Sequence, residues 1–203
     1  MSFYQNNEIE ESIKKFGAIK IYNILIDLKD SLIISNNQEY SHKIYNWINT
    51  KNKIDVELLY RKSRDGDSYD TFHQLCDDKG KTLILIQGTE NFIIGAYTPI
   101  NWNNYSGEWL MDDETFLFSL TNNKIYRKSE LSTESIYCYK DCGPWFGGIG
   151  FRENGKQNMS QGEFAYSRTG REFYGDINDI IPNEGKSRFF DVNEVEVYKL
   201  VFE

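Results

Sequence analysis

The sequence predicts an α+β protein that is mainly β, with two antiparallel β-sheets packed as a sandwich and a few flanking helices. Three observations carry this prediction: many short strand-like runs, turns rich in Asn, Gly and Asp between them, and an aromatic content of 15%, which suits sheet cores. With 203 residues, 39% of them hydrophobic, the chain is long enough to bury the core of one large domain without disulfides.

Helical spacing appears in the first part of the chain. Residues 6–30 carry loosely spaced apolar side chains, which we interpret as a helical extension. From residue 40 to residue 48, apolar side chains recur at i, i+4, i+7 and i+8, which predicts a helix that packs on the main body. We therefore divide the chain into an N-terminal helical extension, residues 1–30, and one domain, residues 31–203. We expect the extension to be dispensable for folding.

Strand patterns follow in the rest of the chain. The expected strands are residues 56–61, 82–87, 92–98, 116–121, 125–127, 136–139 and 194–202. The second and third form a hairpin around a four-residue turn, and both look buried because they are almost continuously apolar. After the first strand, Asp65 and Gly66 form a tight turn, and Asp67 or Ser68 caps a short helix that ends at Cys76.

Charge and targeting signals restrict the kinds of partner. Asp and Glu number 31 against 23 Lys and Arg, and they are spread along the chain, so no basic surface for nucleic acid is expected. No segment has the apolar character of a secretion signal or a membrane span. Three cysteines in a domain that needs no disulfides indicate free thiols in a reducing compartment, and we expect a cytoplasmic protein that binds other proteins.

A glycine-rich stretch, residues 143–150, has the composition of a phosphate-binding loop but fails the motif tests. A Walker loop needs Lys and Ser or Thr directly after its last Gly, and a dinucleotide motif needs a third Gly where this chain has Glu153. We interpret the stretch as a tight bend whose glycines allow close backbone packing beside buried Trp145 and Phe146.

Four side chains, His73, Cys76, Cys138 and Cys142, match a zinc site in number and chemistry. Their spacing is weak support, because Cys76 lies on the apolar face of a predicted helix and Cys138 alternates within a strand. His73 and Cys76 also suggest a thiol-imidazole pair, since His42 is the only other histidine, but residues three apart on a helix are often neighbours without chemistry. We expect no metal, no cofactor and no catalytic site.

The order of these segments resembles the TLDc domain family over residues 31–202. The early segments similar to the family's opening strand and turn, next helix, next strand and Gly-Gly-Tyr-Thr strand are LLYRKSRDG (58–66), FHQLCD (72–77), KGKTLILI (79–86) and IGAYT (94–98). The later segments similar to its most recognisable strand, its Gly-Pro-x-Phe-Gly-Gly segment and its closing strand are FLFSL (116–120), GPWFGG (143–148) and EVEVY (194–198). Each motif is weak by itself, but their common order is specific.

One departure from the family pattern follows the glycine-rich bend. The family usually continues Gly-Gly-Gly-His-Asp-Leu, whereas this chain has GIGFRE at residues 148–153. Any partner contact served by that His-Asp pair is therefore in doubt here. The glycines and aromatic residues that shape the bend remain.

The resemblance implies the sandwich fold with no established active site or cofactor. It also implies a non-catalytic module that confers oxidative-stress resistance, with members that bind and regulate the vacuolar proton-pumping ATPase (V-ATPase). Loops held between rigid strands are the expected contact sites for protein partners. Their candidate residues are Ser63, Arg64, Asp65, Gly66, Gly143, Pro144, Gly147 and Gly148.

Two other functions remain as alternatives. One is a thiol-based antioxidant protein that uses Cys76, Cys138 or Cys142. The sequence context disfavours it, because Asp77 and Asp78 follow Cys76 and Asp141 precedes Cys142, and acidic neighbours do not activate thiols. The other is a self-associating scaffold, which rests on the N-terminal extension alone.

Overall fold

β-Strands dominate the computed structural model of this chain, as predicted. The structure describes residues 26–103, 107–128, 135–146, 149–151, 158–164, 180 and 189–203. The strands are β1 (Ile54–Arg61), β2 (Thr82–Gly88), β3 (Ile93–Thr98), β4 (Glu108–Leu110), β5 (Phe116–Ser119), β6 (Lys124–Arg127), β7 (Ile136–Cys138), β8 (Trp145–Phe146), β9 (Ile149–Gly150), β10 (Gln161–Phe164) and β11 (Phe189–Phe202). The predicted helical extension lies, up to residue 25, outside the described residues.

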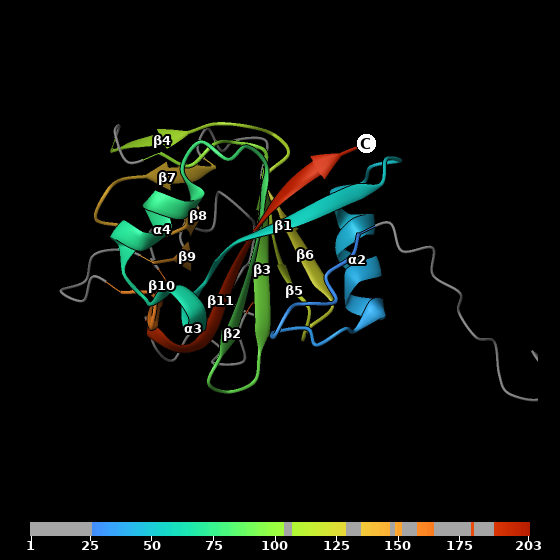
Figure 1. Cartoon of the computed structure of the whole chain (residues 1–203), viewed down its shortest axis with the longest axis horizontal. Coiled ribbons are helices and arrows are strands. Elements are labelled where there is room, and N and C mark those ends of the chain that lie inside the picture. The colour runs from blue at the N-terminus through green and yellow to red at the C-terminus, as the bar shows by residue number, and fades with distance from the viewer. Residues whose placement is uncertain are drawn as a thin grey trace, which may run out of the picture.

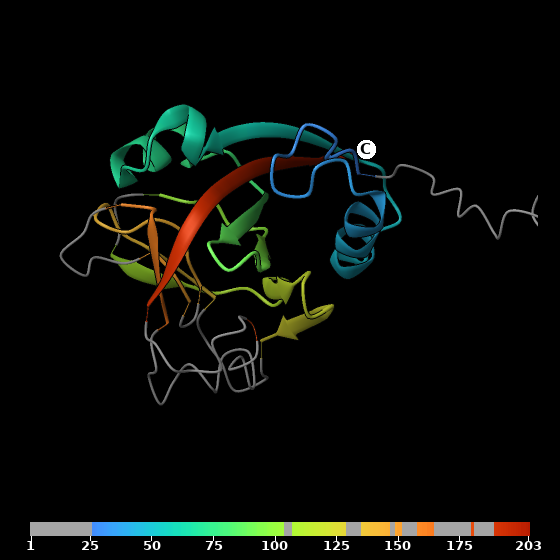
Figure 2. The same cartoon turned by 90° about the horizontal axis from the view of Figure 1, so that it is seen from below.

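The strands join into one open antiparallel sheet in the order β4-β7-β8-β9-β10-β11-β2-β3-β5-β6, with β1 also paired to β11. β11 connects the two halves, because residues 189–191 pair with β10 and residues 192–199 pair with β2. Figure 2 shows β11 as the long red strand that curves from one half to the other. The predicted sandwich of two sheets is therefore not confirmed, since the hydrogen bonding is continuous through β11.

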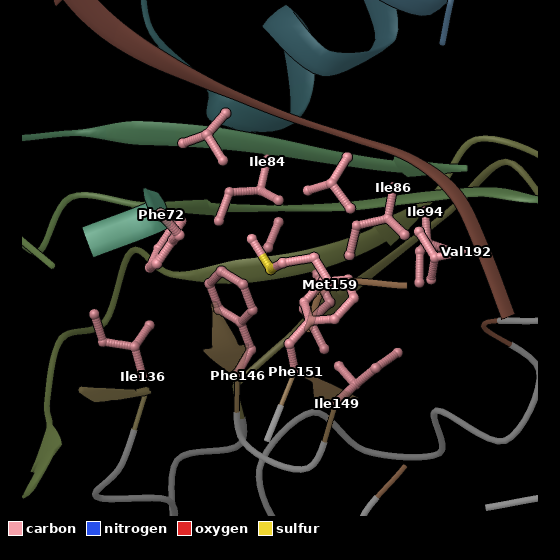
Figure 3. Packing of buried hydrophobic residues seen from close by; sticks show 14 of the residues in the cluster. Phe72, Ile84, Ile86, Ile94, Ile136, Phe146, Ile149, Phe151, Met159 and Val192 are labelled. Carbon is pink, nitrogen blue, oxygen red and sulfur yellow. The ribbon is translucent and has the colours of Figure 1, made fainter. Parts of the chain in front are cut away.

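Alternate side chains of β2 point into two different hydrophobic cores. Ile84 belongs to the first core, where it lies with Phe146 of the other half of the sheet (Figure 3). Leu83 belongs to the second core, which is covered by α2 (Gln38–Ile48) and residues 26–34. β2 and β3 are buried on both faces, as their apolar sequence predicts, and each fully buried aliphatic side chain contributes roughly 1.5–3 kcal/mol.

α2 closes the second core on the side of the molecule opposite to β7–β10 (Figure 1). It begins two residues before the predicted start because the Asn37 side chain accepts hydrogen bonds from two backbone N–H groups of the first turn. It ends at Asn49, which has a left-handed φ of 56°. The Trp47 ring lies 5.5 Å from the ring of Phe118 in β5, so the predicted apolar face packs on the sheet.

Residues 26–30 are part of the domain. Ile26 bridges Ile54 of β1, and the Ile26 and Leu28 side chains are each 2% exposed within the second core. The predicted domain start at Ser31 leaves these residues outside, and the helical interpretation does not hold for them. Their alternation with polar Asp27 and Lys29 suits a short extended segment along β1.

Candidate functional site

Two short helices follow β1 and form one end of the molecule. α3 (Lys62–Asp65) is a single turn that ends at Gly66, whose φ of 89° is a conformation that favours glycine. α4 (Tyr69–Cys76) begins after Ser68, whose hydroxyl accepts a hydrogen bond from the Asp70 N–H at 3.1 Å. The predicted cap at Ser68 and the predicted helix end are confirmed.

Two of the predicted contact residues, Arg64 and Asp65, bind backbone groups of β1. Arg64 donates from Nη2 to the Leu59 carbonyl at 2.9 Å, and Asp65 Oδ2 accepts from the Arg61 N–H at 2.9 Å. The Arg64 guanidinium also donates to the Asp65 carboxylate, and this bond lowers the pKa of Asp65. The pair therefore satisfies the backbone at the end of the strand and holds α3 in place.

β11 places two buried carboxylates, Glu194 and Glu196, beside α3. Glu194 Oε1 accepts from the Ser63 N–H at 3.1 Å and from the Val195 N–H at 3.0 Å. The Ser63 backbone is thus fixed, while its side chain lies on the surface. The sequence analysis did not single out either carboxylate. The signal that was available is a pair of acidic residues that alternate with Val195 and Val197 in the closing strand.

Glu196 is completely buried and joins three segments. Arg61 of β1 donates from Nε to Oε1 at 2.9 Å, and its Nη2 forms an ion pair with the same oxygen at 2.8 Å. Ser31 Oγ and the Leu32 N–H donate at 2.5 and 2.9 Å, and the Tyr198 hydroxyl donates at 3.0 Å. We call these five residues the Glu196 cluster. Both carboxylate oxygens of Glu196 accept hydrogen bonds from other residues of the protein. The cluster therefore has a structural role, which is to hold the N-terminal segment against the sheet.

His73 lies on the buried side of α4. Its Nδ1 is 2.8 Å from Asp77 Oδ1, and its Nε2 is 3.0 Å from the Tyr139 carbonyl and 2.9 Å from the Cys142 carbonyl. Burial lowers the pKa of His73, but Asp77 and the two carbonyls together raise it above the ordinary histidine value. Both ring nitrogens therefore have partners other than the Cys76 thiol that the sequence analysis considered.

The three cysteines are core residues in this structure. Cys76, Cys138 and Cys142 are free thiols with 0–2% exposure. Burial raises the pKa of Cys76 strongly and raises the pKa of Cys138 to about 11, so both thiols are protonated at neutral pH. These environments do not activate the thiols for redox chemistry.

We expect a small alkylating reagent to modify the three cysteines at least about a hundredfold more slowly in the native protein than in urea. A reaction that requires opening of buried structure is slowed by the free energy of that opening, here about 3 kcal/mol or more. Mass spectrometry of time-quenched samples measures each rate. Labelling of any of the three at its unfolded rate in the native protein would show an accessible thiol.

The glycine-rich bend packs against α4, so the two predicted loops meet at the same end of the molecule. A Cβ atom on Gly143 would lie 3.4 Å from Tyr69 Cδ1 of α4. Gly143 and Pro144 are buried and offer little surface to a partner. The other two candidates in this bend, Gly147 and Gly148, lie outside the described residues.

The exposed part of this region consists of Ser63, Arg64, Gly66, Asp70 and Gln74, which we call the α3–α4 surface. It combines the exposed half of the predicted turn with the outer side of α4. Backbone bonds from Glu194 and from the Arg64–Asp65 pair hold it to the sheet. A surface so fixed binds a partner without a large cost for ordering a loop.

The described residues contain neither a metal site nor a helix that could span a membrane. In that part of the chain, no three His, Cys, Asp or Glu side chains gather closely enough to hold a metal ion. The helices in the same residues are too short or too polar for any of them to cross a bilayer.

Comparison with known proteins identifies the family of this chain. A family model described as TLDc domain matches residues 28–201. No curated protein matches the chain significantly. The matched region begins at Leu28 in the second core and ends at Val201 in β11, so it includes the first core, nearly all of the second, the Glu196 cluster and the α3–α4 surface.

Proposed function

Because the chain belongs to the TLDc domain family, we propose that it is a non-catalytic cytoplasmic binding module that confers oxidative-stress resistance by binding and regulating the V-ATPase. The observation that carries the proposal is the family match over residues 28–201. The ordered motifs in the sequence agree with it.

The positions of the histidine and cysteine side chains support a role in binding rather than catalysis. His73 engages Asp77 and two carbonyls, the three thiols are buried, and burial raises the pKa of Cys76 and Cys138. A catalytic centre needs a nucleophile or base that is free to meet a substrate. In the described part of the chain, His73 is hydrogen-bonded within the protein and the three cysteines lie in the core, so these groups are not presented to a substrate.

The α3–α4 surface is our proposed contact site for the partner. Its backbone is fixed by Glu194, Arg64 and Asp65, while the side chains of Ser63 and Gln74 remain exposed. Exposed polar side chains on a rigid frame are typical of interfaces that form between folded proteins. We leave Gly143 and Pro144 out of the proposed contact site, although they were predicted to belong to it, because both are buried.

We expect the double variant Ser63→Arg/Gln74→Arg to bind purified V-ATPase about tenfold more weakly, or worse, because two added charges disturb a complementary interface. The matched control is Asn46→Arg/Asn52→Arg, which adds the same charge at exposed positions on and just after α2. The control should bind as the unmodified protein does. Surface-immobilised binding and survival of peroxide-treated cells are the two measurements. Equal V-ATPase binding by both variants would show that the α3–α4 surface is not the contact site.

The thiol alternative is tested in the same assays by replacing Cys76, Cys138 and Cys142 together with alanine. The proposal expects V-ATPase binding and protection to persist once cooperative unfolding shows that the variant is folded. Protection lost in this variant, with folding and binding intact, would overturn the binding function and favour thiol chemistry.

A further inference from the structure

We propose that His73 is a pH-sensitive latch, which in its protonated form holds the end of α4 to the turn after β7 at residues 139–142. The inference goes beyond the proposed function, because it does not depend on which partner the domain binds. It rests on what each ring nitrogen faces.

Both nitrogens of the His73 ring face hydrogen-bond acceptors. Asp77 Oδ1 lies 2.8 Å from Nδ1, while the carbonyl oxygens of Tyr139 and Cys142 lie 3.0 and 2.9 Å from Nε2. A neutral imidazole carries one N–H and one lone pair, so either neutral tautomer would point a lone pair at an acceptor. Only the imidazolium donates on both sides.

The charged surroundings of the ring agree with a cation. On α4 and its cap, the Asp77 carboxylate faces the ring, Cys76 carries a buried thiol, and the Phe72 ring lies edge-to-face with the His73 ring at 5.1 Å between centroids. On the turn, the ring meets backbone carbonyls, and Lys140 and Asp141 stand between them in the sequence. Asp77 is the facing carboxylate among these groups, so the protonated ring has a counter-charge inside a buried site.

Loss of the proton forces the ring to release one side. A neutral His73 keeps either its bond to Asp77 or its bonds to the two carbonyls of the turn. The pKa of His73 is raised in the folded state, so the latch contributes fully below the ordinary value of 6.5. That contribution is lost as pH rises through the folded-state pKa. The turn leads directly into Gly143 and Pro144, so the junction between the bend and α4 loosens as the pH increases.

Ring nitrogen NMR tests the protonation state directly. The chain has only two histidines, so a His42→Gln variant assigns the His73 signals without ambiguity. We expect two protonated ring nitrogens on His73 at pH 6.5 and loss of one proton at higher pH. A singly protonated ring at pH 6.5 would overturn the proposal, and this result needs no His73 variant to fold.

Hydrogen exchange tests whether the proton controls the junction. In the unmodified protein, exchange protection of α4 and residues 139–143 should fall as pH rises from the ordinary pKa of His73 to its pKa in the folded state. The fall should be up to about tenfold per pH unit, after correction for intrinsic rates. In His73→Gln, which is neutral at every pH, this extra fall should be absent. The same pH profile in both proteins would overturn the latch. Amides of α2, which lies away from the junction, provide the internal reference.

Discussion

Replacing Glu196 with alanine is expected to lower the free energy of unfolding by about 3–5 kcal/mol, because it leaves a largely buried arginine without its counter-charge. The Arg61 side chain is only 15% exposed and makes one hydrogen bond and an ion pair with Glu196. The Ser31 hydroxyl and the Leu32 N–H lose their acceptor in the same change. Such a loss is a large fraction of the stability of an ordinary domain. Urea unfolding at neutral pH, followed by tryptophan fluorescence, measures it.

The matched control for this variant is Glu57→Ala on the neighbouring strand β1. Glu57 is also a glutamate in the sheet, but its side chain is 66% exposed and lies 3.9 Å from Lys199. Exposed pairs of this kind contribute little, so the control should lose less than about 1 kcal/mol. If Glu196→Ala unfolds at the same urea concentration as Glu57→Ala, the Glu196 cluster does not fasten the N-terminal segment.

A second large loss, about 4 kcal/mol, is expected for Gly150→Ala in β9. Gly150 has a φ of 146°, and a Cβ there would lie 2.1 Å from the Pro144 carbonyl oxygen and 2.8 Å from Trp145 Cα. These are backbone atoms of the paired strand β8 and of the residue just before it, which cannot move aside while the register between Trp145 and Gly150 persists. Backbone strain contributes roughly 1–3 kcal/mol and crowding roughly as much again. Thermal and urea unfolding both report the change.

Gly66→Ala separates the two causes. Gly66 also has a positive φ, 89°, but no atom lies within 4 Å of the position of a new Cβ. Only the strain remains, so this variant should lose about 2 kcal/mol. Equal losses for the two variants would mean that the close approach at Gly150 has no energetic effect. The bend would then tolerate a side chain at that position.

Local signals in the sequence predicted the local parts of the fold. α4 was found from its cap at Ser68, and α2 was found from its apolar face, which includes Trp47, because these signals lie within a few residues. The β2–β3 hairpin was found because a short turn separates two apolar runs. In the candidate site, exposed Ser63 and Arg64 lie where the turn was predicted.

Long-range contacts were not predictable from these signals. The Ser31 hydroxyl that binds Glu196 is 165 positions away, and the carbonyl that His73 binds at Cys142 is 69 positions away. No local pattern shows which distant group meets a buried charge. The closing strand was predicted from residue 194, but it begins at Phe189, and the missed residues include the three that pair with β10. Missing them hid the connection that makes the sheet continuous.

The position of β11 has a consequence for the way the chain folds as it is synthesised. β11 pairs with β1, β2 and β10, and β1 and β2 leave the ribosome long before it does. Until β11 emerges, the pairing edges of these early strands have no native partner and are open to association with other chains. Native pairing of β1 and β2 with β11 therefore waits until residues 189–202 have been synthesised, although both strands lie more than 100 residues earlier in the chain.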